Sequence, residues 1–573
     1  MKKSLVALKA KRESFYKRFK KLGNFRRGSL TVNYRKCGKK NCICTTKGHP
    51  GHGPQYLWSI TLKGKSYAKK LELGPELQKY KEEISNYRDY KKLCDEIIQV
   101  NEEICDLIAI PVVENNNELE DLKKKFAESV QEEIQKEVDR LINLSFKDKR
   151  QSGHFELEPL EFQIRSSMHQ IGSHILEKLL NSDGGDYNGR NIPCERGHNY
   201  EFVEYRAKKL LTVLGPVEVK RAYYHDKECK NGFCSKDKDL DIEGTSFSPG
   251  VRRMMSRAGT YKPFSFGQED IKELAGLHVD TKEIERQSNQ SGQQVEKYFE
   301  KEAITALSNK VIPMKKVPII YICMDGTGIP VVKSETVNRK GKGEGGTSKT
   351  REVKLGCVFT QTSVDEKGHP VRDEMSTSYV GAIETAEEFS SRIYAESIRR
   401  GAQRAEKVCV IGDGAPWIWN IADEQFYGAI QIIDLYHARE HYWNVAKVAF
   451  GNDKERKQWA HKRRKELDQG KVEKVIKAIC ELPASFQEEN ELFEKEANYF
   501  DKNKNRMRYN EFRKEGFFVG SGVLEAGCRT VIGQRLKQSG MHWTVNGANN
   551  IIALRCCFFS NRWEDFWEYR ACG

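Results

Sequence analysis

Three short apolar segments in the second half of the chain each lead into an aspartate. The segments have the length and apolar content of buried strands, and they are Val317–Met324, Val408–Ile411 and Ile430–Ile433. The acids that follow them are Asp325, Asp413 and Asp434. One aspartate after a strand usually caps a helix or forms a turn. Three in succession are more informative, because the carboxyl ends of strands in an α/β sheet border a crevice in which sites form. The pattern predicts an α/β sheet with acids along one edge.

A further acid, Glu525, follows the turn Gly520-Ser521-Gly522 in the first turns of an expected helix. Carboxylate oxygens are the ligands that Mg²⁺ and Mn²⁺ prefer. Two such ions about 4 Å apart can activate a nucleophile and stabilise the leaving oxygen of an in-line phosphodiester displacement. We therefore expect Asp325, Asp413 and Glu525 to converge on shared Mg²⁺ (or Mn²⁺). The alternative is that each acid only caps a helix or forms a turn.

The chain of 573 residues has a formal net charge of +15. Eleven Lys or Arg residues and one Glu lie between Lys2 and Arg27, which favours a polyanionic partner, although a solvated helix face gives the same pattern. No apolar run reaches the roughly 20 residues of a membrane span, and the first residues lack the apolar core of a secretory signal. We expect a cytoplasmic protein whose 16 cysteines are mostly reduced.

Two groups of cysteines and histidines have the ligand types of a zinc site. The first group lies between positions 37 and 52, and its members are Cys37, Cys42, Cys44, His49 and His52. The second group flanks a segment that alternates like a β-hairpin around Leu214-Gly215-Pro216, and its members are Cys194, His198, Cys229 and Cys234. This arrangement resembles a zinc ribbon with irregular spacing, in which His225 could replace His198. In both groups, thiols and imidazoles without a metal remain the alternative.

The segment Gln268–Gly292 has the pattern of a helix-turn-helix. Gly276 is the expected turn, and Asp280 with Glu283 approximates a capping box at the start of the second helix. That helix would expose Lys282, Arg286 and Gln290 to a DNA groove. Glycine-turned helix pairs are common, so an ordinary structural role is the alternative.

Helical, charged sequence separates these parts. The stretch from Pro75 to about Arg150 predicts two helices in a hairpin or coiled-coil spacer, and the stretch from Ala438 to about Lys514 predicts a helical insertion. The expected divisions are 1–74 (basic Cys/His-rich module), 75–150 (spacer), 151–245 (helix and zinc-ribbon-like hairpin), 246–312 (helix-turn-helix region), 313–437 (first part of the α/β core), 438–514 (insertion) and 515–573 (rest of the core).

Several motifs resemble those of one family. They are MDGTG, TREVKLGCVFTQT, GDGAPWIWN, DLYHAREH and SGVLEAGCRTVIGQRLKQSGMHW. From about Cys194 to Trp567 the chain resembles bacterial insertion-sequence DDE transposases of the ISKra type, which are distantly similar to the mutator group. The resemblance implies an α/β, ribonuclease-H-like catalytic core with a helical insertion, preceded by helical and zinc-ribbon-like or helix-turn-helix DNA-binding domains. The N-terminal Cys/His-rich module is additional to it.

The resemblance also implies an activity. It implies Mg²⁺-dependent cleavage and transfer of DNA strands, double-stranded terminal inverted repeats and target DNA as partners, and a homo-oligomer associated with the nucleoid. Asp325 and Asp413 match the catalytic aspartates and Glu525 the catalytic glutamate, while Asp434 with His437 matches an accessory motif. Basic residues near the glutamate are candidate phosphate contacts, namely Arg529, Arg535 and Lys537. The alternatives are a non-catalytic DNA-binding regulator derived from a transposase and a metal-dependent nuclease without strand transfer.

Overall fold

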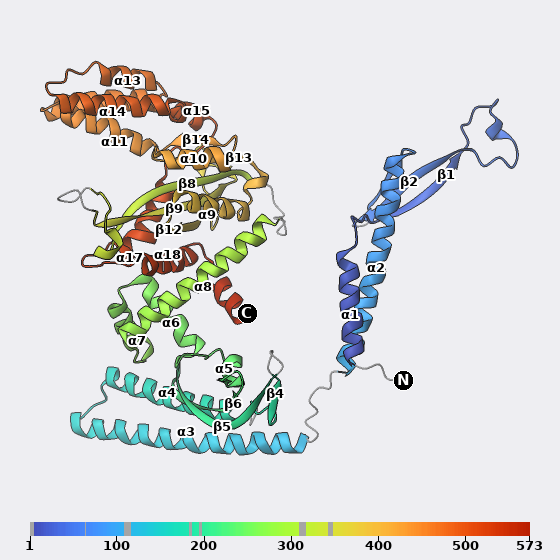
Figure 1. The fold of residues 1–573 in the computed structure, drawn as a ribbon, viewed down its shortest axis with the longest axis vertical. Helices are drawn as coiled ribbons and strands as arrows, with labels where there is room; N and C mark the ends of the chain where they lie inside the picture. Colours follow the sequence, from blue (N-terminus) through green and yellow to red (C-terminus); the bar gives the residue numbers. More distant parts are fainter. Residues whose placement is uncertain are drawn as a thin grey trace. The chain divides into compact units, whose positions relative to one another are not determined.

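The computed structural model describes residues 5–62, 65–107, 116–182, 186–193, 198–308, 317–341 and 348–572. The chain divides into two compact units, Met1–Ser129 and Val130–Gly573 (Figure 1). Each unit is described separately below.

The first unit joins two helices to a small antiparallel sheet. Its elements are α1 (Leu5–Lys20), β1 (Ser29–Arg35), the 3₁₀ turn η1 (Ile43–Thr45), β2 (His52–Leu62), β3 (Lys65–Leu71) and α2 (Pro75–Leu107). The strands pair in the order β1-β2-β3. Leu8 and Phe15 of α1 are buried against apolar side chains of α2, at Leu93, Val100 and Ile104. Burial of this apolar stripe fixes α1 along α2.

The two helices predicted for residues 75–150 are present, and the boundary between the two compact units, after Ser129, falls within the second of them. These helices are α2 and α3 (Asn116–Ser152). The apolar stripe of α2 is already covered by α1, whereas α3 lies along α4 (Leu157–Ser182), where Arg140 donates a hydrogen bond to Gln170. The apolar spacing of α2 and α3 does not specify the partners α1 and α4 that lie along them.

The expected β-hairpin is part of a four-stranded antiparallel sheet. The strands are β4 (Asn191–Pro193), β5 (Asn199–Thr212), β6 (Gly215–Asp226) and β7 (Asn231–Phe233), followed by the short helix α5 (Ser235–Asp239). Thr212 pairs with Gly215 at the end of the hairpin. One face is buried by Val217 and Val219 of β6, which pack with Leu176 and Leu180 of α4.

Three helices occupy the region expected to contain a helix-turn-helix: α6 (Pro249–Tyr261), α7 (Phe264–Ala275) and α8 (Thr281–Leu307). Gly276 ends α7 in the left-handed conformation, at φ 67°, which glycine adopts without steric cost. The predicted capping box is wrong. Asp280 occupies the N-cap position but its side chain makes no capping hydrogen bond, and Glu283 forms an ion pair with Arg286 instead.

A five-stranded mixed sheet forms the centre of the second unit, in the order β12-β9-β8-β13-β14. The strands are β8 (Val317–Pro330), β9 (Thr350–Gln361), β12 (Ser378–Ala382), β13 (Ala405–Gly412) and β14 (Ile430–Ile433). β8, β9 and β12 pair antiparallel, whereas β13 runs parallel to both β8 and β14. A separate ribbon pairs β10 (Ser363–Val364) with β11 (Pro370–Val371).

Helices cover both faces of this sheet (Figure 1). On one face are α9 (Ala386–Arg399) and α10 (Pro416–Gln425). Side chains of α9 pack directly over Gly356 of β9, where a Cβ atom would meet them. Ile418 of α10 packs over Gly412 of β13 in the same way. The other face is covered by the C-terminal segment, which contains α16 (Gly522–Gly527), a π-helical turn (Cys528–Gly533), α17 (Gln534–Leu536) and α18 (Val545–Phe559). A last helix, α19 (Trp563–Cys572), follows.

The stretch between β14 and α16 is helical. Its elements are α11 (Leu435–Ala449), α12 (Asp453–Asp468), α13 (Val472–Cys480), α14 (Gln487–Asn503) and α15 (Tyr509–Lys514). These helices lie beyond the β13–β14 edge of the sheet (Figure 1). Within the part of the chain that the structure describes, no helix combines the length and apolar character needed to cross a membrane.

Candidate functional site

Strand register aligns the predicted acids. Cys323 of β8 is opposite Ile411 of β13, and Gly412 of β13 is opposite Ile433 of β14. Continuing this register past the strand ends places Asp413 opposite both Asp325 and Asp434. Because neighbouring strands are about 4.8 Å apart, the three backbone positions are adjacent along one edge of the sheet.

Asp325 is a partly buried carboxyl held from two sides. The backbone amide of Gly326 donates to Oδ1 at 2.7 Å, and the thiol of Cys528 donates to Oδ2 at 3.3 Å. Burial raises the pKa of Asp325, and the negative charge of Asp413 raises it further. The two aspartates are therefore close enough to repel each other.

Asp413 lies in a turn whose shape depends on glycine. Gly414 has a φ of 107°, and a Cβ there would approach Cε2 of Tyr499 to 2.6 Å. The Tyr499 hydroxyl donates to the Asp413 carbonyl at 2.8 Å, and the amide of Ala415 donates to Asp413 Oδ1 at 2.9 Å. A tyrosine from α14 thus fixes the turn, and only glycine leaves room for it.

Glu525 approaches the aspartates from α16. Burial raises the pKa of Glu525, and the charges of Asp434, Glu440 and Asp325 raise it further. Charge on His437 lowers the pKa of both Glu525 and Asp325. Glu525 therefore lies close enough to Asp325 and Asp434 for their charges to interact, and His437 lies close enough to act on both Asp325 and Glu525. The name "acidic site" is used below for Asp325, Asp413, Asp434, His437 and Glu525.

Asp434 differs from the other acids because it is completely buried. One carboxylate oxygen accepts the amides of Tyr436, at 2.6 Å, and His437, at 3.0 Å, at the start of α11. The other oxygen accepts the amide of Ser521, which immediately precedes α16. Asp434 therefore positions two helices, and its contacts are those of a structural cap rather than of an open ligand.

His437 is the member of the acidic site whose positive charge acts on the acids. Among the residues that the structure describes, no lysine or arginine forms an ion pair with its acids, and none is among the causes that shift the pKa of Asp325 or Glu525. Across the described residues, the carboxylate oxygens of these acids do not belong to a group of three or more ligand atoms that all lie within 4.8 Å of one another. The structure therefore does not bring Asp325, Asp413 and Glu525 to the spacing of ligands around one ion.

The three basic residues predicted near Glu525 have different positions. Arg529 and Lys537 are exposed, and Lys537 donates to the hydroxyl of Thr327, two residues beyond Asp325. The prediction of a DNA contact at Arg535 is wrong. Its side chain is fully buried, donates to the carbonyl of Gly259 at 2.9 Å and lies over the rings of Phe264 and Trp543. Arg535 therefore joins the C-terminal segment to α6 and α7.

Two side chains at the acidic site were not found from the sequence. Cys528 follows Glu525 by three residues, which places both on one face of a helix and was a usable signal. Tyr499 comes from the helical insertion, 86 residues after the turn that it contacts. No local pattern could have identified that contact.

The N-terminal Cys/His group is brought together in part. Ligand atoms of four residues lie within 4.8 Å of one another, and the residues are Cys37, Cys42, Cys44 and His52. His49 is not among them, since its Nδ1 accepts the amide of Gly51 at 3.0 Å. The backbone amide of Lys39 is the largest cause that lowers the pKa of Cys37, to about 6.

The second group differs from the predicted zinc ribbon. His198 Nδ1 lies 3.2 Å from the sulfur of Cys229, and Asp226, which the sequence analysis missed, completes a group of three. Cys194 lies outside the described residues. Cys234 is wrong as a ligand of this group, because it is buried at the N-cap of α5, where burial raises its pKa.

The helix-turn-helix region presents the predicted side chains to solvent. Lys282, Arg286 and Gln290 are exposed along the first half of α8. The opposite face of α8 packs closely on α18, where a Cβ on Gly292 would meet the backbone of Asn550. One side of α8 therefore carries exposed polar side chains, and the other side packs on α18, which covers the sheet.

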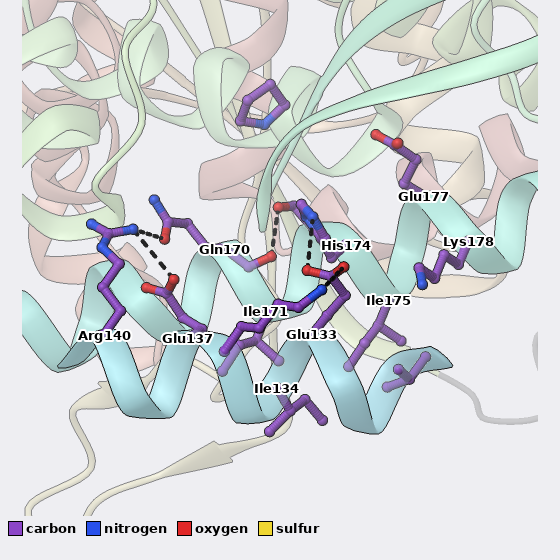
Figure 2. Close-up of a pocket in the computed structure, with 14 residues that line it drawn as sticks. Glu133, Ile134, Glu137, Arg140, Gln170, Ile171, His174, Ile175, Glu177 and Lys178 are labelled. Atoms are coloured by element: carbon purple, nitrogen blue, oxygen red, sulfur yellow. Dashed lines mark hydrogen bonds and ion pairs between the residues drawn. The ribbon is translucent and has the colours of Figure 1, made fainter. Parts of the chain in front are cut away.

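A separate cavity of about 590 Å³ lies between α3 and α4. Figure 2 shows His174 of α4 facing Glu133 of α3 across it, at 3.8 Å, and Arg140 beside Gln170. Its lining includes no residue of the acidic site. We assign no role to it.

Comparison with known proteins gives a family. A protein-family profile described as uncharacterised protein family UPF0236 matches residues 150–563. The chain belongs to this family. Two UPF0236 proteins of Caldanaerobacter subterraneus subsp. tengcongensis are each 25% identical to it over 357 residues, or 61% of this chain and 67% and 63% of the relatives. The UPF0236 segment includes every residue of the acidic site and excludes the N-terminal Cys/His group.

Proposed function

We propose that the protein is a DDE-type DNA transposase, which cleaves DNA at the ends of a mobile element and joins them to target DNA. The observation that carries this proposal is the alignment of Asp325 with Asp413 in the register of the neighbouring parallel strands β8 and β13, together with the negative charge of Asp325, which raises the pKa of Glu525. An acidic site of this kind suits phosphodiester chemistry, in which positioning and charge neutralisation dominate.

The donor set fits Mg²⁺. Asp325, Asp413 and Glu525 offer the carboxylate oxygens that hard divalent ions require, and no lysine or arginine among the described residues shifts the pKa of Asp325 or Glu525. When bound, a pair of ions supplies Lewis-acid activation of the attacking oxygen and stabilisation of the leaving oxygen.

The remaining residues of the acidic site position these ligands. Asp434 anchors the start of α16 through Ser521 and so holds Glu525 near the sheet. The Cys528 thiol donates to Oδ2 of Asp325, and the backbone amide of Gly326 donates to Oδ1 of the same carboxyl group. The partly exposed His437 is placed to compensate charge on Asp325 and Glu525.

The architecture supports the same proposal. A five-stranded mixed sheet in the order β12-β9-β8-β13-β14 is the arrangement expected of a ribonuclease-H-like core. The helices between β14 and Glu525 occupy the place of the helical insertion that such transposases carry. The name of one UPF0236 relative joins four locus designations and that of the other joins two. A protein sequence repeated at several loci is expected of a mobile element.

Cleavage is tested on a plasmid that carries the coding region with its flanking DNA. We expect Mg²⁺-dependent nicks at the ends of short inverted repeats, followed by joined products in which the 3′ ends are attached to new DNA. A non-catalytic regulator would bind these ends without nicking them. A nuclease without strand transfer would give nicks and no joined product. Because two ends must be brought together, we also propose a homo-oligomer, measured as the mass of the DNA-bound complex.

Mg²⁺ binding has a readout that does not depend on activity. We expect Mg²⁺ to raise the midpoint of thermal unfolding, by the equivalent of about 2.7 kcal/mol at 100 times its dissociation constant. Most of that increase should be lost in Asp325→Asn, whose side chain keeps the size of aspartate but not its charge. Equal stabilisation of both proteins in differential scanning calorimetry would argue against a metal at Asp325.

DNA binding by α8 is tested through its salt dependence. We expect affinity for end DNA to fall steeply with salt, and each phosphate contact removed by Lys282→Ala or Arg286→Ala to reduce the log–log slope by about 1. Lys136→Ala on α3 is a control, since that exposed lysine pairs with Glu132. Fluorescence anisotropy over a salt series measures the slopes. Identical slopes for all three variants and the unaltered protein would remove α8 from the DNA interface.

A further inference from the structure

The loop between β1 and β2 has an unusual construction. Arg35 pairs with His52 at the ends of the two strands, and residues 36–51 connect them. Every residue of this connection is described, and Cys44 is its one buried side chain. Apart from the turn Ile43–Thr45, the connection has no helix or strand. It therefore lacks an apolar core that could hold it in one conformation.

Three thiols and one imidazole meet at the base of this loop. Cys37 Sγ lies 3.5 Å from Cys44 Sγ, and Cys42 Sγ lies 2.9 Å from His52 Nε2. All four ligand atoms lie within 4.8 Å of one another. A tetrahedral ion with Zn–S bonds of about 2.3 Å and a Zn–N bond of about 2.0 Å places its ligand atoms roughly 3.5–3.8 Å apart. The 3.5 Å separation of Cys37 and Cys44 matches this spacing, whereas the 2.9 Å separation of Cys42 and His52 is shorter, so these two side chains would move slightly apart to hold an ion.

The contacts within the group also match a metal–thiolate centre rather than a disulfide. A disulfide joins its sulfurs at about 2.05 Å, whereas Cys37 and Cys44 are 3.5 Å apart and all three cysteines are free. The backbone amide of Cys37 is directed at the sulfur of Cys44 at 3.4 Å. The turn that contains Cys42 is closed by the amide of Thr45, which donates to the Cys42 carbonyl at 2.9 Å.

We propose that Cys37, Cys42, Cys44 and His52 bind one structural Zn²⁺, which cross-links the β1–β2 connection at its base. All four positions are filled by protein, as in structural rather than catalytic zinc sites. Linking Cys37, just after β1, to His52, the first residue of β2, restricts the loop in the unfolded chain as a cross-link does. The site lies outside the UPF0236 segment and is independent of the proposed transposase activity.

The test measures metals in the full-length protein, purified without chelators, by inductively coupled plasma mass spectrometry. We expect Cys44→Ser and His52→Ala each to lose about one zinc ion per chain relative to the unaltered protein. His49→Ala is the matched control, because His49 belongs to the same loop but its ring accepts the amide of Gly51 and lies outside the group of four ligands. It should keep its zinc. Cys229→Ser identifies any metal held by the second group and should leave the loss caused by Cys44→Ser unchanged.

A second measurement keeps all four proposed zinc ligands and therefore does not depend on how Cys44→Ser or His52→Ala folds. In Cys229→Ser, X-ray absorption at the zinc edge should give three sulfur neighbours at about 2.3 Å and one nitrogen at about 2.0 Å. The proposal is overturned if this protein contains no stoichiometric zinc, if zinc has only nitrogen and oxygen neighbours, or if another metal occupies the site. It is also overturned if His49→Ala loses as much zinc as His52→Ala.

Discussion

Asp413→Asn is expected to lower the rate of strand cleavage at element ends by at least about 10³-fold while leaving end binding unchanged. Asparagine keeps an oxygen that can accept the amide of Ala415, so the turn after β13 is preserved. It removes the negative charge that divalent ions need between the strands. Cleavage is measured with end-labelled DNA in Mg²⁺, and binding is measured by anisotropy in Ca²⁺-free and Mg²⁺-free buffer.

Asp423→Asn is the matched control. Asp423 lies on α10, is exposed and accepts a hydrogen bond from Gln431 at 2.6 Å, away from the crevice edge of the sheet. Its replacement should leave cleavage and binding at the level of the unaltered protein. Cleavage retained by Asp413→Asn, or lost equally in both variants, would contradict the assignment of Asp413.

Asp434→Ala is expected to lower the free energy of unfolding by about 3 kcal/mol. The substitution removes the cap of α11 and leaves the buried amide of Ser521 without an acceptor. An unpaired buried donor costs roughly 1–3 kcal/mol beyond the loss of an ordinary cap. Urea denaturation followed by tryptophan fluorescence measures the change.

Asn452→Ala separates this effect from capping in general. Asn452 caps α12 through one amide, that of Lys454, in an exposed position. Its removal should cost about 1 kcal/mol. If the two alanine variants unfold at the same urea concentration, Asp434 does not tie α16 to α11. If Asp434→Ala is as stable as the unaltered protein but inactive, its role is chemical rather than positional.

Several predictions that rested on local patterns agree with the structure, although the capping box of Asp280 and Glu283 does not. The apolar runs before Asp325, Asp413 and Asp434 form strands, because burial on both faces of a parallel sheet requires near-continuous apolar sequence. Gly276 forms the turn between α7 and α8, because a left-handed residue at a helix end strongly favours glycine.

The predictions that failed required knowledge of partners. Arg535 was predicted to contact phosphate, yet its guanidinium is buried, donates to the carbonyl of Gly259 and lies over the rings of Phe264 and Trp543. Cys234 has the right ligand type, but it forms the start of α5 instead of joining His198. Residue type alone does not specify which side chains share a site.

The sequence by itself determined the apolar strands before Asp325, Asp413 and Asp434, the helical stretches and the Cys/His content of the β1–β2 connection. These follow from periodicity and turn chemistry, which act between residues a few positions apart. However, β8 continues through Asp325 to Pro330, so this acid lies within a strand and not at its end. Only the tertiary structure decided that Asp413 lies opposite Asp325, that Asp434 anchors α16, and that His52 rather than His49 joins the three thiols. Strand register depends on which face of each strand is buried, and a buried polar group needs a hydrogen-bonding partner. Both are set by contacts between segments that are far apart in the sequence.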